Sequence, residues 1–349
     1  MHKDKYFKQA LIYIIIGLIT TACSIIYWDY FGKNPSNVNL NKGEKYYLYI
    51  HKGDSFDDIV HFLEHDSVLY DINSFIKEAH ESEYNLNFKP GRFEITSDMS
   101  NKDIIDMLMK GEQTPVSVTF TYTRKMETIA KKVSTQIEAD SAEIMQAFND
   151  EEFIKSLGYD MYSRYLLAIP NTYEFFWNTT AEGFWKRMKV ESNRFWNEKR
   201  MKEADSIGFT PLEVITLASI VEMETSKKEE NAKIAGVYMN RLKKGYKLQA
   251  DPTLAFLLDW NNRRILNKHK KIDSPYNTYI HRGLPPGPIC IPSIAAIDAV
   301  LNYEKHDYIF FCADANFTGY HNFAVTYSQH KKNARKYQAA LNNRRIYNK

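Results

Sequence analysis

The sequence has few cysteines and no excess of charge of either sign. Its 349 residues include 3 cysteines and carry a formal net charge of +3. A protein dedicated to nucleic acid would show a strong basic excess, so this balance gives no case for nucleic-acid binding. The motifs C-x-x-C and H-E-x-x-H are absent from the sequence, so a zinc site has no support and we expect neither a metal nor a cofactor.

The three cysteines lie far apart in the sequence. Cys23 falls in an N-terminal apolar run, which leaves Cys290 and Cys312 for the folded part. These two could form a disulfide in an oxidising compartment, or they could be buried free thiols, and spacing alone does not decide between the two. We expect free thiols.

Internal repeats and low-complexity segments are also lacking, and the hydrophobic content of 44% supports folded cores. One apolar run stands out: residues 10–28 carry no charge over 19 residues, which suffices to cross a hydrocarbon core of about 30 Å. Three lysines and one acid precede it. Because positive charge stays inside, we expect a cytoplasmic tail over 1–9, a transmembrane helix over 10–28 with Tyr27 and Trp28 at the interface, and the rest outside the cytoplasm. A cleaved signal peptide is the alternative.

The next part of the chain alternates short strand and helix patterns. Residues 29–44 are polar and contain Gly, Pro and Asn, which is typical of a linker. The segment 45–122 is predicted to be a small α+β module. Its expected strands cover 46–50, 93–96 and 116–122, and its expected helices cover 57–64, 72–80 and 101–110.

Residues 123–209 are rich in helix patterns and in aromatic residues. We interpret them as a helical subdomain. Its rings are explained by a core of large side chains, and the alternative is that some of them line a carbohydrate groove.

A buried helix is predicted to follow. Thr210 suits the N-cap, Pro211 the first helical position, and Glu213 the partner of a capping box. Only three of the residues from 212 to 221 are polar, and a helix without a polar face is a buried helix. Its end carries Glu222. Burial and the negative end of the helix dipole both disfavour a charged carboxylate there, and a protonated acid in a cleft is what glycosidic cleavage requires.

Two further acids could assist Glu222. Glu224 lies two residues further along the helix and points about 200° away, so a shared site is not expected. If the helix ends between them, Glu224 could still hydrogen-bond a neighbouring loop. Asp251 either caps the following helix or takes part in the site. We expect Gln249 and Asp251 to shape the cleft.

The C-terminal part of the chain is predicted to alternate helices and loops. A helix over 227–244 should begin at a capping box of Ser226 and Glu229 and end at Gly245. Asn240 and Arg241 on this helix could bridge to the loops. Further helices are expected from residue 254 and over 292–301, and a hairpin over 308–312 and 320–324.

One loop has polar groups suited to sugar hydroxyls and N-acetyl groups. They belong to Ser274, Tyr276, Asn277 and Thr278, although Pro275 could simply make this loop a rigid turn. His321 is a further candidate near the site, with a structural or surface role as the alternative.

Taken together, five stretches in order resemble the endolytic murein transglycosylases, the MltG or YceG-like family. They are LASIVEMET (217–225), GVYMNRLKKGYKLQADPT (236–253), SPYNTY (274–279), GLPPGPI (283–289) and a tail with YIFFCAD (308–314), HNFAVTY (321–327) and HKKN (330–333). Any one of these motifs is weak, but five in order are specific.

This resemblance implies an α+β protein with a LysM-like module over 45–122, which includes Lys89–Phe93, and a catalytic domain over 210–349. It places the family's catalytic glutamate on Glu222. It implies cleavage of the bond between N-acetylmuramic acid and N-acetylglucosamine within nascent strands of peptidoglycan, which gives 1,6-anhydro ends and terminates elongation. It also implies a single-pass protein of the inner membrane with its C-terminal part in the periplasm, and penicillin-binding synthases as partners.

Two other functions stay open at this point. A muramidase-type peptidoglycan hydrolase would use Asp251 as its second carboxylate, since hydrolysis needs a second acid to activate water. A non-catalytic membrane anchor would bind the wall without cutting it. A pyridoxal-phosphate enzyme is not supported, because no lysine is singled out for a Schiff base.

Overall fold

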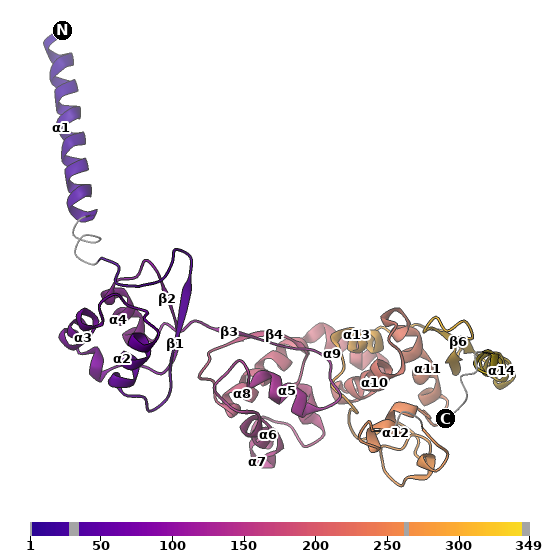
Figure 1. Cartoon of the computed structure of the whole chain (residues 1–349). Helices are drawn as coiled ribbons and strands as arrows, with labels where there is room; N and C mark the ends of the chain where they lie inside the picture. Colours follow the sequence, from indigo (N-terminus) through magenta and orange to yellow (C-terminus); the bar gives the residue numbers. More distant parts are fainter. Residues whose placement is uncertain (1, 28–34, 262–264, 344–349) are drawn as a thin grey trace. The chain divides into compact units, whose positions relative to one another are not determined.

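The computed structural model describes residues 2–27, 35–261 and 265–343, with side chains from residue 13 onward. The chain divides into two compact units (Figure 1). The first comprises the residues up to 116 together with 176–178, and the second comprises 117–175 and the residues from 179 onward. Both units combine helices with two-stranded sheets, so the predicted α+β class is confirmed.

The first unit begins with helix α1 (His2–Tyr27). Its apolar stretch covers Tyr13–Tyr27, and among the described residues no single helix meets the length and hydropathy of a membrane span. Helices α9 (Glu198–Ile207) and α10 (Pro211–Glu224) pass that test only when counted as one pair, bent by 77°. Trp28 and residues 29–34 of the predicted linker lie outside the described residues.

The rest of the first unit packs helices against a two-stranded sheet. Strands β1 and β2 are antiparallel, with Leu48 opposite Phe93, and both of these side chains are fully buried. The predicted elements are confirmed, with ends that differ by two residues or fewer. Their bounds are β1 (Lys45–Ile50), α2 (Phe56–His65), α3 (Ile72–Glu81), β2 (Gly91–Thr96) and α4 (Asn101–Lys110).

The second unit opens with a sheet that the sequence analysis did not predict in full. Strand β3 (Val116–Phe120) pairs with β4 (Asn171–Phe175), which lies inside the region expected to be helical. The surrounding rings form a core: Trp185 is buried and donates its indole N–H to the carbonyl of Ile144 at 2.9 Å. The helices around it are α5 (Met126–Val133), α6 (Ser141–Asn149), α7 (Glu151–Ser156) and α8 (Ala181–Phe195).

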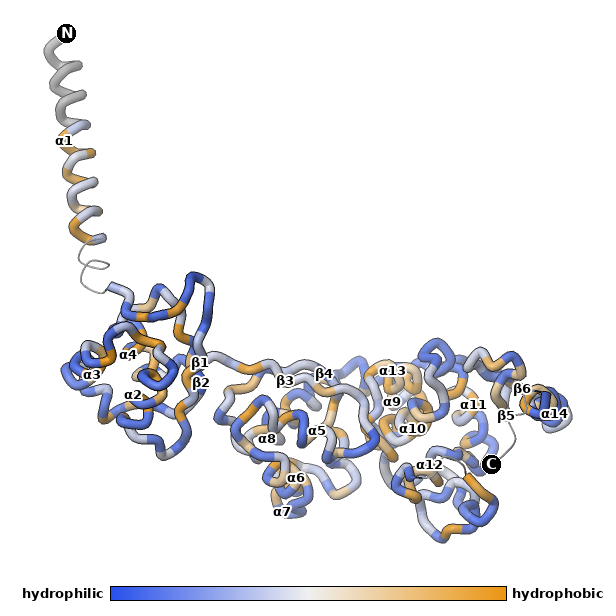
Figure 2. The backbone as a smooth tube through the Cα atoms, viewed as in Figure 1, coloured by the Kyte–Doolittle hydropathy of each residue, from blue (hydrophilic) through white to orange (hydrophobic). Residues whose placement is uncertain are grey.

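Helix α10 is the centre of the next core. It packs beside α11 (Asn231–Lys243) and α13 (Ile294–Leu301), and Figure 2 shows hydrophobic residues along α10 and α13. The predicted start is confirmed, because Thr210 and Glu213 form a reciprocal capping box with Pro in the first turn. Every residue from 214 to 221 is buried, as expected of a helix without a polar face.

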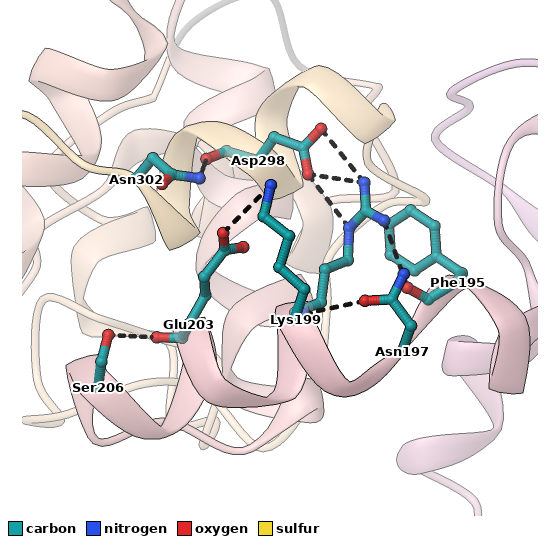
Figure 3. Close-up of polar contacts among 8 residues, drawn as sticks. Phe195, Asn197, Lys199, Glu203, Ser206, Asp298 and Asn302 are labelled. Carbon is teal, nitrogen blue, oxygen red and sulfur yellow. Dashed lines mark hydrogen bonds and ion pairs between the residues drawn. The ribbon is translucent and has the colours of Figure 1, made fainter.

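Helix α13 is also tied to α9 by polar contacts (Figure 3). The guanidinium of Arg200 donates to the Asp298 carboxylate, with Nη2 and Oδ1 3.1 Å apart. Asn197 caps α9 by accepting from the N–H of Arg200. The Arg200–Asp298 ion pair thus ties α9 to α13.

The C-terminal part ends in a hairpin and a long helix. Strands β5 (Phe310–Ala313) and β6 (His321–Ala324) pair as predicted and precede α14 (Tyr327–Asn343). The predicted buried strand over 308–312 is wrong in extent and burial, since β5 starts at 310 and is half-buried throughout. Asn240 and Arg241 do bridge from α11: they donate to the carbonyls of Tyr308 at 3.0 Å and Ile309 at 2.7 Å.

The predicted start of α11 is wrong. The helix begins at Asn231 after a short 3-10 turn over Lys228–Glu230, and neither element has a side-chain cap. Ser226 and Glu229 therefore form no capping box. Gly245 does follow the helix end with a left-handed φ of 67°.

Candidate active site

Glu222 lies in the last turn of α10 and is half-buried. Its Oε2 atom accepts two hydrogen bonds from Ser293, one from the hydroxyl at 2.5 Å and one from the backbone N–H at 3.1 Å. Within the described part of the chain, the other oxygen, Oε1, accepts no hydrogen bond. The sequence predicted a carboxyl group at the end of a buried helix, in a setting that disfavours its charge. Ser293 adds two polar donors on one side of it, which the sequence did not predict.

Ser293 is a site residue that the sequence analysis missed. It is the N-cap of α13, where its hydroxyl accepts from the N–H of Ala296 at 3.2 Å while donating to Glu222. The sequence signal was a serine directly after Pro292 and before an apolar helix, which marks a cap. The cap alone could not show that Ser293 also reaches α10.

A pocket of about 320 Å³ opens at the end of α10. Glu222 and Glu224 both line it, together with Tyr122 from the segment after β3. The two glutamates, which helix geometry was expected to point apart, therefore line one pocket. The remaining lining residues are Met223, Thr225, Ser226, Lys228 and Asn231.

Glu224 is the last residue of α10, and its carboxyl group is held by a buried phenol. The hydroxyl of Tyr238 on α11 donates to Glu224 Oε1. Burial raises the pKa of Glu224 to about 7, and the nearby Asp251 adds to the rise, whereas the Tyr238 hydrogen bond and Arg241 oppose it. The pocket thus contains an acid that exchanges its proton near neutral pH.

Asp251 begins α12 (Asp251–Leu257) but does not cap it. The N-cap is Ala250, so the capping interpretation is wrong. Instead, Asp251 Oδ1 accepts a hydrogen bond from the hydroxyl of Tyr279 at 2.5 Å. Burial first, and then the Asp251 hydrogen bond, raise the pKa of Tyr279 far above its ordinary value.

The predicted sugar-binding loop uses its polar groups inside the protein. Asn277 is fully buried and donates to the carbonyls of Lys270 at 3.3 Å and Ile272 at 2.7 Å. Thr278 is buried and accepts from the N–H of Ala250 at 3.0 Å. The structure thus places both side chains within the scaffold rather than in the lining of the Glu222 pocket.

Two other residues of this loop are also engaged by the protein. The Ser274 hydroxyl accepts from the N–H of Tyr276 at 3.2 Å. The Tyr276 ring is half-buried and packs against Phe256, with ring centroids 4.9 Å apart.

The other predicted site residues lie elsewhere. Gln249 is exposed and lines a separate hollow with Arg282 and the lysines after α11. Asn240 holds the C-terminal hairpin. His321 pairs with the buried Glu230, with Nδ1 and Oε2 2.9 Å apart. Of the predicted residues, the pocket thus brings together Glu222 and Glu224.

Neither cysteine of the folded part forms a disulfide. Cys290 is buried and Cys312 is half-buried, and both are free thiols. The disulfide alternative is therefore wrong. Across residues 2–27, 35–261 and 265–343, no group of three or more His, Cys, Asp or Glu side chains is placed to hold a metal ion.

Comparison with known proteins gives consistent matches. The YceG-like family matches residues 48–336. The endolytic murein transglycosylase of Bacillus subtilis is 29% identical over 292 residues, which cover 77% of this chain and 80% of that protein. The endolytic murein transglycosylase of Streptococcus pneumoniae D39 is 31% identical over 262 residues. This match covers 65% of this chain and 47% of that longer protein.

A solved structure is also similar. The 2.6 Å crystal structure of a YceG-like protein from Listeria monocytogenes superposes with a TM-score of 0.54 at 28% sequence identity. The match covers 83% of this chain and 99% of the Listeria chain.

Proposed function

This chain belongs to the YceG-like family, and from that membership we propose that it is an endolytic murein transglycosylase. It cleaves the glycan strands of peptidoglycan internally, as a lyase acting on polysaccharide. The observation that carries the proposal is a carboxyl group, Glu222, that is oriented by two donors at the edge of a pocket. The relatives named endolytic murein transglycosylase support the same conclusion.

In the proposed mechanism Glu222 is the acid and then the base. It first protonates the oxygen between N-acetylmuramic acid and N-acetylglucosamine, which becomes the leaving group. The resulting carboxylate is stabilised by the hydroxyl and N–H of Ser293. It then accepts the proton of the muramyl C6 hydroxyl as that oxygen bonds to C1, so the product has a 1,6-anhydro end.

An intramolecular acceptor removes the need to activate water. The C6 hydroxyl is already part of the reacting sugar, so it needs positioning rather than a second carboxylate. Asp251, the second acid of a hydrolytic mechanism, is instead engaged by Tyr279. The engagement of Asp251 argues against hydrolysis that uses this residue as the second acid.

The surroundings of the enzyme are part of the same proposal. The uncharged run over 10–28 anchors the chain in the cytoplasmic membrane as a single span, with the C-terminal part in the periplasm. The small unit with β1, α2, α3 and β2 acts as a LysM-like module that binds glycan. Penicillin-binding synthases, which make the strands, are the proposed partners.

The test is a digestion with product analysis. Purified glycan strands are incubated with the full chain in detergent, and the new ends are identified by mass spectrometry. Anhydro ends at internal positions support the proposal. Reducing ends would establish a hydrolase instead, and binding without cleavage would establish a wall-binding anchor. E222Q is the control, because the amide keeps the shape of the side chain but cannot donate a proton as an acid.

A further inference from the structure

Three hollows share lining residues around the segment that follows β3, and together they are called the groove here. Tyr122 lines both this pocket and a second hollow of about 650 Å³. Arg124 and Trp260 line this second hollow and also a third, of about 260 Å³. Tyr122 therefore links the Glu222 pocket to the hollow that Arg124 and Trp260 line, and these two residues link that hollow to the third.

Trp260 is presented to this groove by a strained turn. Asp259 and Trp260 are consecutive residues with left-handed φ values of 51° and 58°. Such backbone angles are rare for a bulky residue and persist only where the surroundings enforce them. Here the ion pair between Lys125 and Asp259, at 2.6 Å, and the hydrogen bond from the N–H of Trp260 to the carbonyl of Ala255, at 2.8 Å, hold the turn.

Arg124 lies over the ring of Trp260, with its guanidinium carbon 5.0 Å from the ring centroid. The residue is exposed, and no carboxylate among the described residues forms an ion pair with it. Its neighbour Lys125, in contrast, is neutralised by Asp259. The Trp260 ring limits the orientations of the guanidinium but accepts none of its N–H groups in an ordinary hydrogen bond. These N–H groups can therefore bind an anion.

This cation lies within electrostatic range of the catalytic end of the groove. Burial raises the pKa of the Cys290 thiol, the charge of Glu222 adds to the rise, and Arg124 opposes it. Both charged groups therefore act on one thiol, which donates to the carbonyl of Ser219 on α10 at 3.4 Å. The hollows joined at Tyr122 let a strand bound at Glu222 extend to Arg124.

We infer that Arg124, stacked on Trp260, binds a carboxylate of the peptide stem that hangs from a muramyl residue of the bound strand. This inference rests on the proposed function, because it assigns a feature of the same substrate. Planar guanidinium groups match carboxylates with two parallel hydrogen bonds. The groove would thus select strands that still bear peptides over strands from which an amidase has removed them.

The experiment measures binding without turnover. Full-length protein with E222Q is compared with the double variant E222Q/R124A, and each is titrated with peptide-bearing strands and with amidase-stripped strands. The expected result is a Kd about tenfold higher for the double variant on peptide-bearing strands, with no change on stripped strands. R124K should recover part of the loss, because it keeps the charge without the planar donors.

R194A is the matched control, since Arg194 is an exposed arginine paired with Glu191 on α8. It should behave as the parent protein on both strands. An equal loss on both kinds of strand, or no loss with R124A, would overturn the inference. A failure of the proposed function would be detected in a different experiment, the digestion of glycan strands, in which the unsubstituted chain would then release no new ends.

Discussion

The end of α10 and the loop over 274–279 both carry polar side chains, but they use them differently. At the end of α10, Glu222 lines a pocket and has one carboxyl oxygen that accepts no hydrogen bond from the described residues. In the loop, Asn277 and Thr278 are buried and bonded to backbone groups. Polar residues clustered near a site therefore include some that can reach substrate and others that hold the backbone, and burial separates the two kinds.

The sharpest contrast comes from E222Q. Loss of general acid–base catalysis should lower kcat by about 10²- to 10⁴-fold, because the amide cannot transfer the proton. The melting temperature should stay the same, since the amide fits the same space. Turnover is measured by release of anhydro ends. Near-normal turnover would place the acid elsewhere in the pocket.

The loop should respond in the opposite way. N277A should lower the free energy of unfolding by about 2–4 kcal/mol, because it leaves buried carbonyls and an N–H without partners. Activity per folded molecule should change little. Urea denaturation measures the loss, and N302A is the control, since Asn302 is exposed and makes one bond to the carbonyl of Asp298. A variant that is stable but does not cleave would mean that Asn277 reaches substrate.

S293A tests a residue that both holds the backbone, as the N-cap of α13, and contacts the catalytic carboxyl group of Glu222. Loss of the N-cap should lower the free energy of unfolding by about 1 kcal/mol. Loss of the hydroxyl that orients the Glu222 carboxyl group should lower kcat roughly tenfold. T180A is the control: Thr180 caps α8 by accepting from Gly183. It should lose stability but keep kcat. Equal kcat in the two variants would show that Ser293 acts only as a cap.

The smallest effect is expected from the pH dependence of Glu224. Its pKa is raised from 4.5 to about 7 in the folded state, so between these values the folded protein binds more protons than the unfolded chain. The free energy of unfolding therefore falls as pH rises through this window. E224Q should remove most of this dependence, while E198Q, at an exposed position, should not. A pH profile unchanged by E224Q would contradict the assignment.

Much of the fold was predictable because its signals are local. Capping residues and the apolar pattern gave α10 its start and its burial. Strand β4 was missed because its alternation of buried Tyr173 and Phe175 lies within a helix-rich region, and its partner, β3, is distant in sequence. Local patterns do not encode such pairing.

The site was less predictable than the fold. Glu222 stood out because it is the acid that ends an apolar helix. Ser293 and Trp260 did not, since one reads as an ordinary cap and the other depends on a left-handed turn that its sequence does not require. The angle of about 200° between Glu222 and Glu224 on a helix also did not predict that both line one pocket. The helix ends at Glu224, and both side chains line the pocket at this end.

The double use of the Ser293 hydroxyl has a consequence for protein engineering. Aspartate is as good an N-cap as serine, and a search for thermostable variants would accept it at this helix start. Here it would introduce a second negative charge next to Glu222 and remove a donor from it. Selection for heat resistance at position 293 should therefore yield robust proteins that no longer cut glycan.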